Sequence, residues 1–396
     1  MTVLNSPPRT GVSSAIRPAT TPDRVRVMVV DDSAVVRGLI IGMLGNDPQI
    51  EIAASVANGA IAVDRFSHGR DVEVIVLDIE MPVMDGLTAL SKLLAIDPTV
   101  QVVMASTLTQ QNAEISLRAL ELGAADYIPK PSSKQLGGSA DFHRDLLSKV
   151  KELAAARRRR LGPIKSATQP GNAPKAAAPA PVASPAVVPS APIALRPNGQ
   201  TRPDIIAIGS STGGPQALSA LLKDLCAEKL SQPILITQHM PPTFTTILAE
   251  HLQRATGVPC AEAVSGEALV GGRIYVAPGD HHLVVEHGPG GLRLRLTRDS
   301  AENFCRPSVD PMLRSVARCY GRRALAVILT GMGSDGLAGC RELVAAGGTV
   351  IAQDQATSVV WGMPGAVATA GLCSAVEPVS RIAARVAALA KGGKDA

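Results

Sequence analysis

Aromatic side chains are scarce in this sequence of 396 residues, which holds one tryptophan, three tyrosines and four phenylalanines. Modules that bind single-stranded nucleic acid stack bases on aromatic side chains, so the shortage argues against such a module. The net charge of +5 is small, and part of it comes from the single run Arg157 to Arg160. Such a run describes one segment, a solvated helix end that enters a linker, rather than a basic surface. We therefore expect no nucleic-acid partner.

Long apolar runs and paired cysteines are also missing. No apolar run is long enough to span a bilayer, and the polar, Pro/Ser-rich stretch 1–21 lacks the apolar centre of a signal peptide. The six cysteines stand singly, without a C-x-x-C pair, which favours reduced thiols in a reducing compartment; they are Cys226, Cys260, Cys305, Cys319, Cys340 and Cys373. These absences predict a cytoplasmic protein.

Composition divides the chain into regions. Apolar residues make up 46% of the sequence, enough for sizeable cores. Residues 24–150 and 204–390 alternate short apolar runs with helical patterns, whereas about 161–203 is mostly proline, alanine and serine and cannot bury a core. We expect a disordered N-terminal extension (1–23), a first domain (24–150), an Arg-rich then Pro/Ala-rich linker (151–203) and a second domain (204–390).

Both domains are predicted to be doubly wound α/β folds, because strands alternate with helices in each. In the first domain five strands are expected to form a parallel sheet, at 25–30, 50–56, 74–77, 100–105 and 126–128, with helices such as 33–44 and 114–122. In the second, strands are expected at 205–209, 234–237, 274–277, 292–296, 324–329 and 349–352, with helices at 215–225, 244–255, 311–317 and 336–345. Residues 274–297 are predicted to form a hairpin that turns at 287–291, which would make the second sheet mixed but mostly parallel.

Polar side chains follow four strands of the first domain. They are Asp31 and Asp32, Asp78, then Ser106 or Thr107, and finally Lys130. Because the carboxyl ends of parallel strands share one rim, these groups converge. Three carboxylates repel one another unless a cation lies among them, and such oxygen ligands suit Mg²⁺. A lysine opposite them can pair with an added phosphoryl group.

In the second domain the apolar run from Ile205 ends abruptly in small residues, Gly209 to Gly214, before a helix. A hydroxyl on this turn would lie at a helix N-terminus, which favours a phosphate or an oxyanion. His239 and Asp335 each follow another strand. Serine becomes a nucleophile when an imidazole takes its proton and a carboxylate orients that imidazole. Ser211 is the candidate nucleophile, although Ser210 and Thr212 compete for this role.

Alternatives follow from the same residues. Ser211 and Asp335 could simply be helix N-caps, and the order Ser, His, Asp differs from that of α/β-hydrolases. The pair His281-His282 does not suggest a metal site, because adjacent residues of a strand point to opposite faces. The second domain could instead only bind a partner or a nucleotide. A transcription factor is a third possibility, but the sequence has no basic recognition helix.

Residues 24–150 closely resemble the response-regulator receiver domain, through the acidic residues, Ser106 and Lys130 described above. The resemblance implies that Asp78 accepts a phosphoryl group and that Asp31, Asp32 and Asp78 bind Mg²⁺. It also implies that Ser106, Tyr127 and Lys130 sense phosphorylation, with Tyr127 as the switch aromatic; the choice between Ser106 and Thr107 is less firmly fixed.

Five strings in the second domain look like the chemotaxis protein-glutamate methylesterase (CheB) family. They are 209–214 (GSSTGG), 238–241 (QHMP), 306–310 (RPSVD), 329–336 (LTGMGSDG) and 361–365 (WGMPG). The resemblance implies Ser211 as nucleophile, His239 as base, Asp335 as the group that orients it, and the backbone N–H of Met332 as an oxyanion donor. No cofactor is implied for this domain. Ser210 stands where the family often has alanine.

The two resemblances together imply a phosphorylation-activated hydrolase of a two-component system. It would demethylate glutamate methyl esters on methyl-accepting chemotaxis receptors, releasing methanol, and deamidate glutamines, releasing ammonia. A histidine kinase would be the phosphodonor, and contact with the membrane would be peripheral, through receptor arrays. We further expect the unphosphorylated receiver to pack over the rim that carries Ser211, with phosphorylation relieving this contact.

Overall fold

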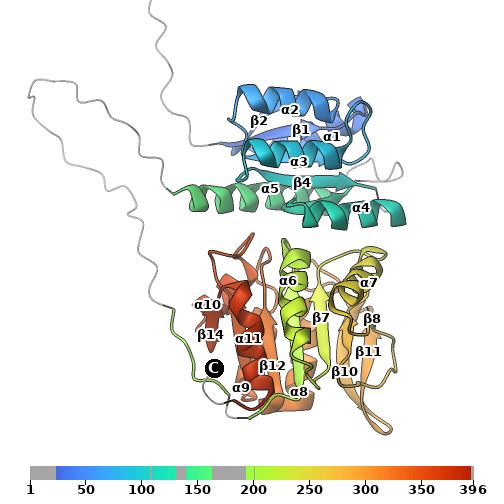
Figure 1. Ribbon diagram of the computed structural model, residues 1–396, viewed down its shortest axis with the longest axis vertical. Coiled ribbons are helices and arrows are strands. Elements are labelled where there is room, and N and C mark those ends of the chain that lie inside the picture. The colour runs from blue at the N-terminus through green and yellow to red at the C-terminus, as the bar shows by residue number, and fades with distance from the viewer. Residues whose placement is uncertain (1–23, 108, 131–139, 163–192, 200, 394–396) are drawn as a thin grey trace, which may run out of the picture.

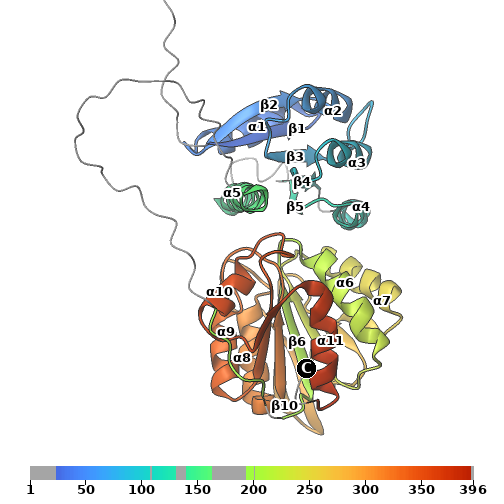
Figure 2. The same ribbon diagram turned by 60° about the vertical axis from the view of Figure 1, so that its left-hand side comes forward.

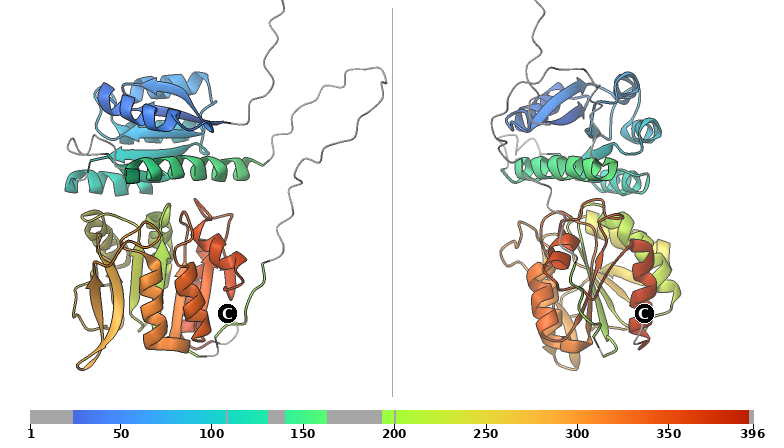
Figure 3. Two further views of the ribbon diagram at one scale, coloured as in Figure 1. Left: turned by 180° about the vertical axis from the view of Figure 1, so that it is seen from behind. Right: turned by 90° about the vertical axis from the view of Figure 1, so that its left-hand side faces the viewer.

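The computed structural model describes residues 24–107, 109–130, 140–162, 193–199 and 201–393. The predicted N-terminal extension (1–23) and most of the predicted linker (163–192) lie outside the described residues. Two α/β units, one N-terminal and one C-terminal, are stacked end to end (Figure 1), with the long helix α5 along their boundary in both views of Figure 3. No helix among the described residues has the length and apolar character to cross a membrane.

The N-terminal unit is a five-stranded parallel sheet with the order β2-β1-β3-β4-β5. Its strands are β1 (Val25–Val30), β2 (Ile50–Val56), β3 (Val74–Asp78), β4 (Gln101–Ser106) and β5 (Asp126–Pro129). Its helices are α1 (Ala34–Gly45), α2 (Gly59–His68), α3 (Gly86–Ile96), α4 (Gln110–Glu121) and α5 (Ala140–Leu161). Helices cover both faces of the sheet (Figure 2), and every residue of β3 and β4 is buried.

Capping side chains decide where several helices of this unit begin. Ser33, Asn58, Asp85 and Thr109 each accept a hydrogen bond from a backbone N–H in the first turn of the following helix. Helix α4 therefore begins at Gln110, four residues before the predicted start, because the cap at Thr109 lies upstream of the apolar pattern.

The C-terminal unit has a seven-stranded sheet with the order β14-β13-β12-β6-β7-β9-β8, in which every pairing is parallel. The strands are β6 (Ile205–Ser210), β7 (Ile234–Gln238), β8 (Cys260–Glu262), β9 (Ile274–Val276), β12 (Ala324–Ile328), β13 (Thr349–Gln353) and β14 (Ala375–Glu377). Helices α6 (Gly214–Ala227), α7 (Phe244–Thr256) and α11 (Val379–Ala390) cover one face, and α8 (Val309–Tyr320), α9 (Leu337–Ala345) and α10 (Met363–Thr369) the other (Figure 2). A short 3₁₀ turn, η2 (Gly321–Arg323), precedes β12.

The predicted hairpin is present but does not belong to this sheet. Strands β10 (His282–Gly288) and β11 (Gly291–Thr297) form a separate antiparallel pair. The expectation that the hairpin would make the large sheet mixed was wrong in this detail, whereas the two doubly wound α/β folds are confirmed. The hairpin packs on α8, because Leu283, Val285 and Leu294 join the apolar cluster that holds Leu313 and Val316.

The two units share a packed boundary. Helix α4 of the N-terminal unit, called the receiver unit below after its resemblance, packs against α6 and α7. The ring of Tyr127 stacks on that of Phe244, with centroids 4.5 Å apart and planes 9° apart. The arginine run at the end of α5 was expected to be a solvated helix end, but two of its side chains make contacts. Arg157 pairs with Asp97 at 2.8 Å, and Arg160 donates to the carbonyl of Ser358 in the C-terminal unit at 2.6 Å.

Candidate active site

The centre of the seven-stranded sheet brings the three predicted catalytic residues to one rim. Ser211, His239 and Asp335 follow β6, β7 and β12, which are neighbours in the order β12-β6-β7. The chain reverses its direction of winding at β6, and ligands of open α/β sheets bind at such a switch point. The sequence predicted the strands, but their order is a property of the fold.

The turn after β6 is held by the side chain of Gln238. Its amide nitrogen donates to the carbonyl of Ser211 at 2.9 Å, and its amide oxygen accepts from Ser210 Oγ at 2.7 Å. Gly214 opens helix α6 next to this amide, where a Cβ atom would lie 1.9 Å from Gln238 Oε1. Glycine is therefore required at 214 for the turn to close on the next strand.

Hydrogen bonding separates the three candidate nucleophiles. Ser210 is fully buried and donates to Gln238, and Thr212 donates to Asp126 Oδ2 of the receiver unit at 2.6 Å. The Ser211 hydroxyl makes no hydrogen bond with any described residue and is partly exposed. Its backbone is fixed, because its N–H donates to the carbonyl of Thr330 at 3.0 Å. Ser211 is thus the one hydroxyl of the three that is free to react within the described structure.

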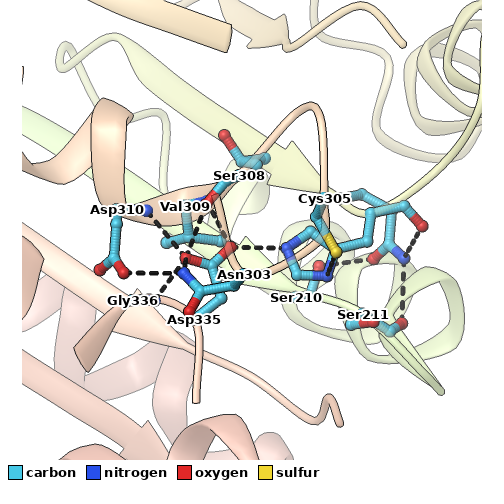
Figure 4. Close-up of polar contacts among 12 residues, drawn as sticks. Ser210, Ser211, Asn303, Cys305, Ser308, Val309, Asp310, Asp335 and Gly336 are labelled. Atoms are coloured by element: carbon cyan, nitrogen blue, oxygen red, sulfur yellow. Dashed lines mark hydrogen bonds and ion pairs between the residues drawn. The ribbon is translucent and has the colours of Figure 1, made fainter. Parts of the chain in front are cut away.

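His239 and Asp335 form a buried ion pair. His239 Nε2 lies 2.7 Å from Asp335 Oδ2 (Figure 4). Burial of the carboxyl opposes its ionisation, but the hydrogen bond and charge of His239 outweigh burial and lower the pKa of Asp335 to about 2. Burial of the imidazole likewise favours its neutral form, but negative charge on Cys305 and the hydrogen bond to Asp335 raise the pKa of His239 to about 10.

The segment before α8 builds a cradle for Asp335 that sequence reasoning missed. Asp335 Oδ1 accepts from Ser308 Oγ at 2.8 Å, from Asn303 Nδ2 at 2.9 Å and from the backbone N–H of Asp310 at 3.0 Å. Oδ2 accepts from the N–H of Val309 at 2.6 Å. The carboxylate therefore caps α8 as well as holding the imidazole. The string 306–310 was a signal for this role, but no residue in it was assigned one.

Asp310 is a second buried carboxyl beside Asp335. Its side chain accepts from the N–H of Gly339 at 2.7 Å and from Asn303 Nδ2 at 3.0 Å. Burial is the main reason why the pKa of Asp310 is raised, and the charge of Asp335 adds to the effect. The two environments thus push the pKa values of two adjacent carboxyls apart, and Asp335 is the one kept ionised.

Cys305 takes a position beside the imidazole that no sequence pattern indicated. Its sulfur lies 3.4 Å from His239 Nδ1 (Figure 4). Both ring nitrogens of His239 are therefore engaged, and neither bonds to Ser211 among the described contacts. The Ser–His hydrogen bond of a working triad is absent in this arrangement.

The predicted oxyanion donor, Met332, lies on the loop after β12. Its backbone N–H bonds to no described residue, whereas the neighbouring Gly331 N–H donates to Val360 at 3.0 Å. An oxyanion site requires a free N–H, and the residue before Met332, Gly331, lies next to Ser211. The side chains of Met332 and Val359 pack on the apolar cluster of the receiver unit, so this loop is also part of the domain boundary.

The receiver unit brings its predicted acidic residues together. Oxygens of Asp31, Asp32 and Asp78 lie within 4.8 Å of one another. Lys130 Nζ lies 2.8 Å from Asp31 Oδ2 and 2.6 Å from Asp78 Oδ1. Burial raises the pKa of Asp78; burial also disfavours a charged Lys130, but the hydrogen bonds to Asp31 and Asp78 outweigh it and raise the pKa of Lys130. Three carboxylates on one rim match the hard oxygen ligands of Mg²⁺.

The remaining receiver residues are placed as follows. Ser106, at the end of β4, is buried and contacts the carbonyl of Thr107 at 3.1 Å. Thr107 follows the strand and accepts from Asn112 Nδ2 at 2.5 Å. Tyr127 is buried at the domain boundary against Phe244 rather than exposed on the receiver surface, and burial raises the pKa of its hydroxyl well above the usual value.

The adjacent histidines 281 and 282 are structural. His282 is buried, and its Nδ1 accepts from the N–H of Ser308 at 3.2 Å, while His281 faces Arg298 at 3.0 Å. The two rings therefore diverge, as expected of neighbours at the start of a strand. His282 thereby holds the segment before α8.

Comparisons with known proteins find relatives that match nearly the whole chain. The CheB methylesterase family model matches residues 206–386, and the response regulator receiver domain model matches residues 27–137. A protein-glutamate methylesterase/protein-glutamine glutaminase of group 2 operon from Rhodospirillum centenum is 58% identical over 388 residues, covering 96% of each chain. One from Azospirillum brasilense is 56% identical over 368 residues, covering 91% of each.

Solved structures are similar to each half separately. The CheB methylesterase catalytic domain of Thermotoga maritima is 40% identical and covers 48% of this chain and 100% of its own, with a TM-score of 0.46. The response regulator domain of Thermotoga maritima CheB is 32% identical and covers 33% of this chain and 97% of its own, with a TM-score of 0.30. From the sequence identity over nearly its whole length, we conclude that the chain belongs to the CheB methylesterase family, as a hydrolase with a receiver domain ahead of its catalytic domain.

Proposed function

We propose that this enzyme hydrolyses glutamate methyl esters on methyl-accepting chemotaxis receptors and deamidates glutamines at such sites, with Ser211, His239 and Asp335 as its catalytic triad. The observation that carries this proposal is the buried His239–Asp335 pair, 2.7 Å between Nε2 and Oδ2, on the rim that also presents the free hydroxyl of Ser211. Relatives that span nearly the whole chain carry the same two activities in their names. We also infer a cytoplasmic location, which the six free cysteines fit.

The reaction follows from the roles of these groups. Ser211 Oγ attacks the γ-carbonyl of the methylated side chain while His239 takes its proton, and Asp335 stabilises the imidazolium. The N–H of Met332 donates to the oxyanion of the tetrahedral intermediate. The imidazolium returns the proton to the leaving group, so that methanol departs and a glutamyl-serine ester remains. Water, deprotonated by His239, then releases glutamate and restores Ser211. A glutamine loses ammonia in the same first step.

Regulation is proposed to act through the packed boundary between the units. Thr212, next to the nucleophile, donates to Asp126 Oδ2 at 2.6 Å, and Lys149 of α5 pairs with the same oxygen at 2.9 Å. A receptor helix cannot reach Ser211 while β5 and α5 cover this rim. Asp78 would accept a phosphoryl group from a histidine kinase, and Lys130, Ser106 and Tyr127 would respond to it, which opens the boundary.

Mg²⁺ fits the receiver site on the chemistry of its donors. Asp31, Asp32 and Asp78 would hold it. When bound, it would neutralise carboxylate charge and the charge of an incoming phosphoryl group. The residues of the chain do the rest: Asp78 supplies the accepting oxygen, and Lys130, already 2.6 Å from it, supplies a positive charge.

The first test is methanol release from methylated receptor membranes by the phosphorylated protein. We expect Ser211→Ala to abolish release, because no other hydroxyl of the turn is free. Ser219→Ala, on the following helix, is the matched control and should retain activity. Release unchanged in Ser211→Ala would move the nucleophile to Ser210 or Thr212, and no release by the wild-type protein would favour a binding module.

Phosphorylation is tested separately from catalysis. Asp78→Asn keeps the shape of the side chain but cannot accept a phosphoryl group. It should therefore show only basal methanol release after treatment with acetyl phosphate and magnesium, while the wild-type protein is activated. Equal activation of both proteins would show that Asp78 is not the phosphoacceptor and would leave the triad assignment untouched.

A further inference from the structure

The proposed catalytic base, His239, contacts a residue outside the triad. Cys305 Sγ lies 3.4 Å from His239 Nδ1, on the side of the ring opposite Asp335 (Figure 4). A histidine that serves as general base needs one nitrogen for the carboxylate and the other for the nucleophile. Here the second nitrogen faces a thiol, and the Ser211 hydroxyl has no bond to the ring among the described contacts. The Cys305 thiol, the His239 imidazole and the Asp335 carboxylate thus form a row of hydrogen-bonded groups.

The loop that carries Cys305 is held in an unusual backbone conformation. Asn303 and Phe304 have φ angles of 52° and 62°, which side chains other than glycine adopt rarely. Asn303 is fixed by its two hydrogen bonds to Asp310 and Asp335, and Glu302 pairs with Arg314 of α8 at 2.5 Å. The loop is thus tied to the triad carboxylate itself, and its position determines whether the thiol reaches the imidazole.

Helix α5 of the receiver contacts the same loop. The Arg144 guanidinium lies 4.3 Å from the centre of the Phe304 ring, which is 77% exposed even with this contact. Two charged residues of α5 also interact with the Cys305–His239 pair: Lys149 with Cys305, and Asp145 with His239. The residue next to Cys305 therefore contacts the helix that must leave when the receiver opens.

We propose that Cys305 is a lock on the catalytic base, His239. While the receiver is packed on the catalytic unit, the Cys305 thiol holds the imidazole nitrogen that Ser211 needs, and departure of α5 from Phe304 releases the imidazole. The inference rests on the proposed roles of Ser211 and His239. The receiver is already proposed to cover the rim, and the contact of Cys305 with His239 adds a second restraint inside the site. Cys305 is in this view a positioning residue, since it acts through His239 and touches no substrate.

The charges around His239 support this reading. Burial alone would lower the pKa of the imidazole, yet negative charge on Cys305 and the bond to Asp335 raise it to about 10. A protonated imidazole cannot take the proton of Ser211, so an environment that raises the pKa of His239 disfavours catalysis. The ionisable groups that act on the ring are Asp335, Cys305 and Asp145; behind them, Asp310 acts on Asp335, Lys149 on Cys305, and Asp126 on Lys149.

Removing the thiol should therefore change the acid limb of the pH–rate profile. Without Cys305 the pKa of His239 should fall, although the bond to Asp335 still raises it. Each unit of this fall raises the fraction of neutral imidazole about tenfold at a pH below both values. The effect should be large in the unphosphorylated chain and small in the phosphorylated one, where α5 has left the loop.

The experiment uses the full chain and a small activated ester, 4-nitrophenyl acetate, which enters a site that excludes a receptor helix. Hydrolysis is followed across pH for the wild-type protein, Cys305→Ala and Cys305→Ser, each with and without acetyl phosphate and magnesium. We expect the acid limb of both variants to move to lower pH by one unit or more when unphosphorylated, with about a tenfold gain in rate at pH 7.

Superimposable profiles of the wild-type protein and both variants would overturn the lock. A merely structural role would lower the melting temperature or raise KM without moving the acid limb, and such a result would also overturn it. Ser211→Ala in the same assay separates the two proposals. Hydrolysis that survives in Ser211→Ala counts against the proposed function, whereas loss of hydrolysis with unshifted profiles counts against the lock alone.

Discussion

At the scale of single residues, the site depends most on Asp335. Its Oδ2 accepts from His239 and the N–H of Val309, and its Oδ1 from Asn303, Ser308 and the N–H groups of Asp310 and Gly336. Such a density of donors keeps the carboxylate ionised and fixes its direction. It therefore determines both the orientation of the imidazole and the start of α8.

Asp335→Asn should lower kcat for methanol release by about 10⁴-fold, as replacement of a triad carboxylate does elsewhere, because the imidazolium loses its counter-charge. The measurement is release by the phosphorylated protein at saturating substrate. The control variant Asp299→Asn changes an exposed acidic residue outside the triad. Its kcat should stay within about twofold of that of the wild-type protein. A loss smaller than tenfold in Asp335→Asn would remove Asp335 from the triad.

The same residue predicts a pH dependence of stability. Because the pKa of Asp335 is lowered from 3.8 to about 2 in the folded chain, its ionisation stabilises the fold at pH values above about 4. This stabilisation, on the order of 2 kcal/mol, is lost as the pH falls from about 4 to about 2. The difference in free energy of unfolding between the wild-type protein and Asp335→Asn, measured in urea, should shrink over that range. A difference independent of pH would contradict the depressed pKa.

At the scale of elements, the junction between β6 and α6 sets the geometry of the nucleophile. Helix α6 begins at Gly214, and its N-cap residue, Gly213, is left-handed and offers no side chain to cap the helix. Gly213 has a φ of 74°, which glycine adopts at little cost. The amide of Gln238 closes the turn from the next strand. Two glycines and one glutamine thus hold Ser211 at the helix N-terminus.

Gly214→Ala tests this junction. Its Cβ would displace the Gln238 amide, which frees Ser210 and shifts Ser211. A displacement of about 1 Å can cost about 10²-fold in rate, so we expect a loss of methanol release of that size. In contrast, Gly42→Ala in α1, where nothing lies within 4 Å of the new Cβ, should leave activity unchanged and stabilise the fold by about 0.5–1 kcal/mol. Full activity of Gly214→Ala would show that the close approach at 214 is not required.

The elements themselves were largely predictable. Strands β1 and β2 have the predicted bounds, and most others differ by one or two residues at an end. In the second domain, helix α11 and the shorter elements β8, β14 and α10 were not predicted; β8 and β14 have three residues each. Segments this short show too little periodicity to be recognised, and their strand conformation comes from pairing at the edges of a sheet that already exists.

At the scale of the whole molecule, the receiver covers the catalytic rim. Gln216 on α6 donates to the carbonyls of Leu120 and Ala124 at the end of α4, both at 2.9 Å. His251 of α7 pairs with Glu121 at 2.7 Å. With the Tyr127–Phe244 stack, these contacts join the two units over the side of the rim next to α6 and α7. The boundary is therefore built from the elements nearest to the nucleophile.

Gln216→Ala should weaken this boundary without touching the site. The loss of two hydrogen bonds, at about 0.5–1.5 kcal/mol each, favours the open arrangement by a factor of about 5 to 150. We expect methanol release by the unphosphorylated protein to rise toward that of the phosphorylated one. Lys223→Ala, on the solvent side of α6, is the control and should leave basal release unchanged. No rise in Gln216→Ala would contradict a boundary that restrains activity.

The sequence by itself determined much of this protein. Alternation of apolar runs with helical patterns gave two doubly wound domains, because hydrophobic period and strand length are local properties. The strand-end rule placed Asp31, Asp32, Asp78 and Lys130 on one rim, and the resemblance to known families named the triad residues in advance. From the local pattern alone Ser210 and Thr212 compete with Ser211 for the role of nucleophile, and it is the resemblance that selects Ser211.

Only the tertiary structure decided the rest, because it depends on contacts between segments far apart in the chain. The hydroxyls of the turn became distinguishable once Ser210 was seen to bond to Gln238 and Thr212 to Asp126, 28 and 86 residues away. The thiol of Cys305, 66 residues from His239, met the imidazole through a loop whose conformation no local propensity favours. Sequence pattern sets which side chains reach a rim, whereas packing between distant elements sets which of them touch.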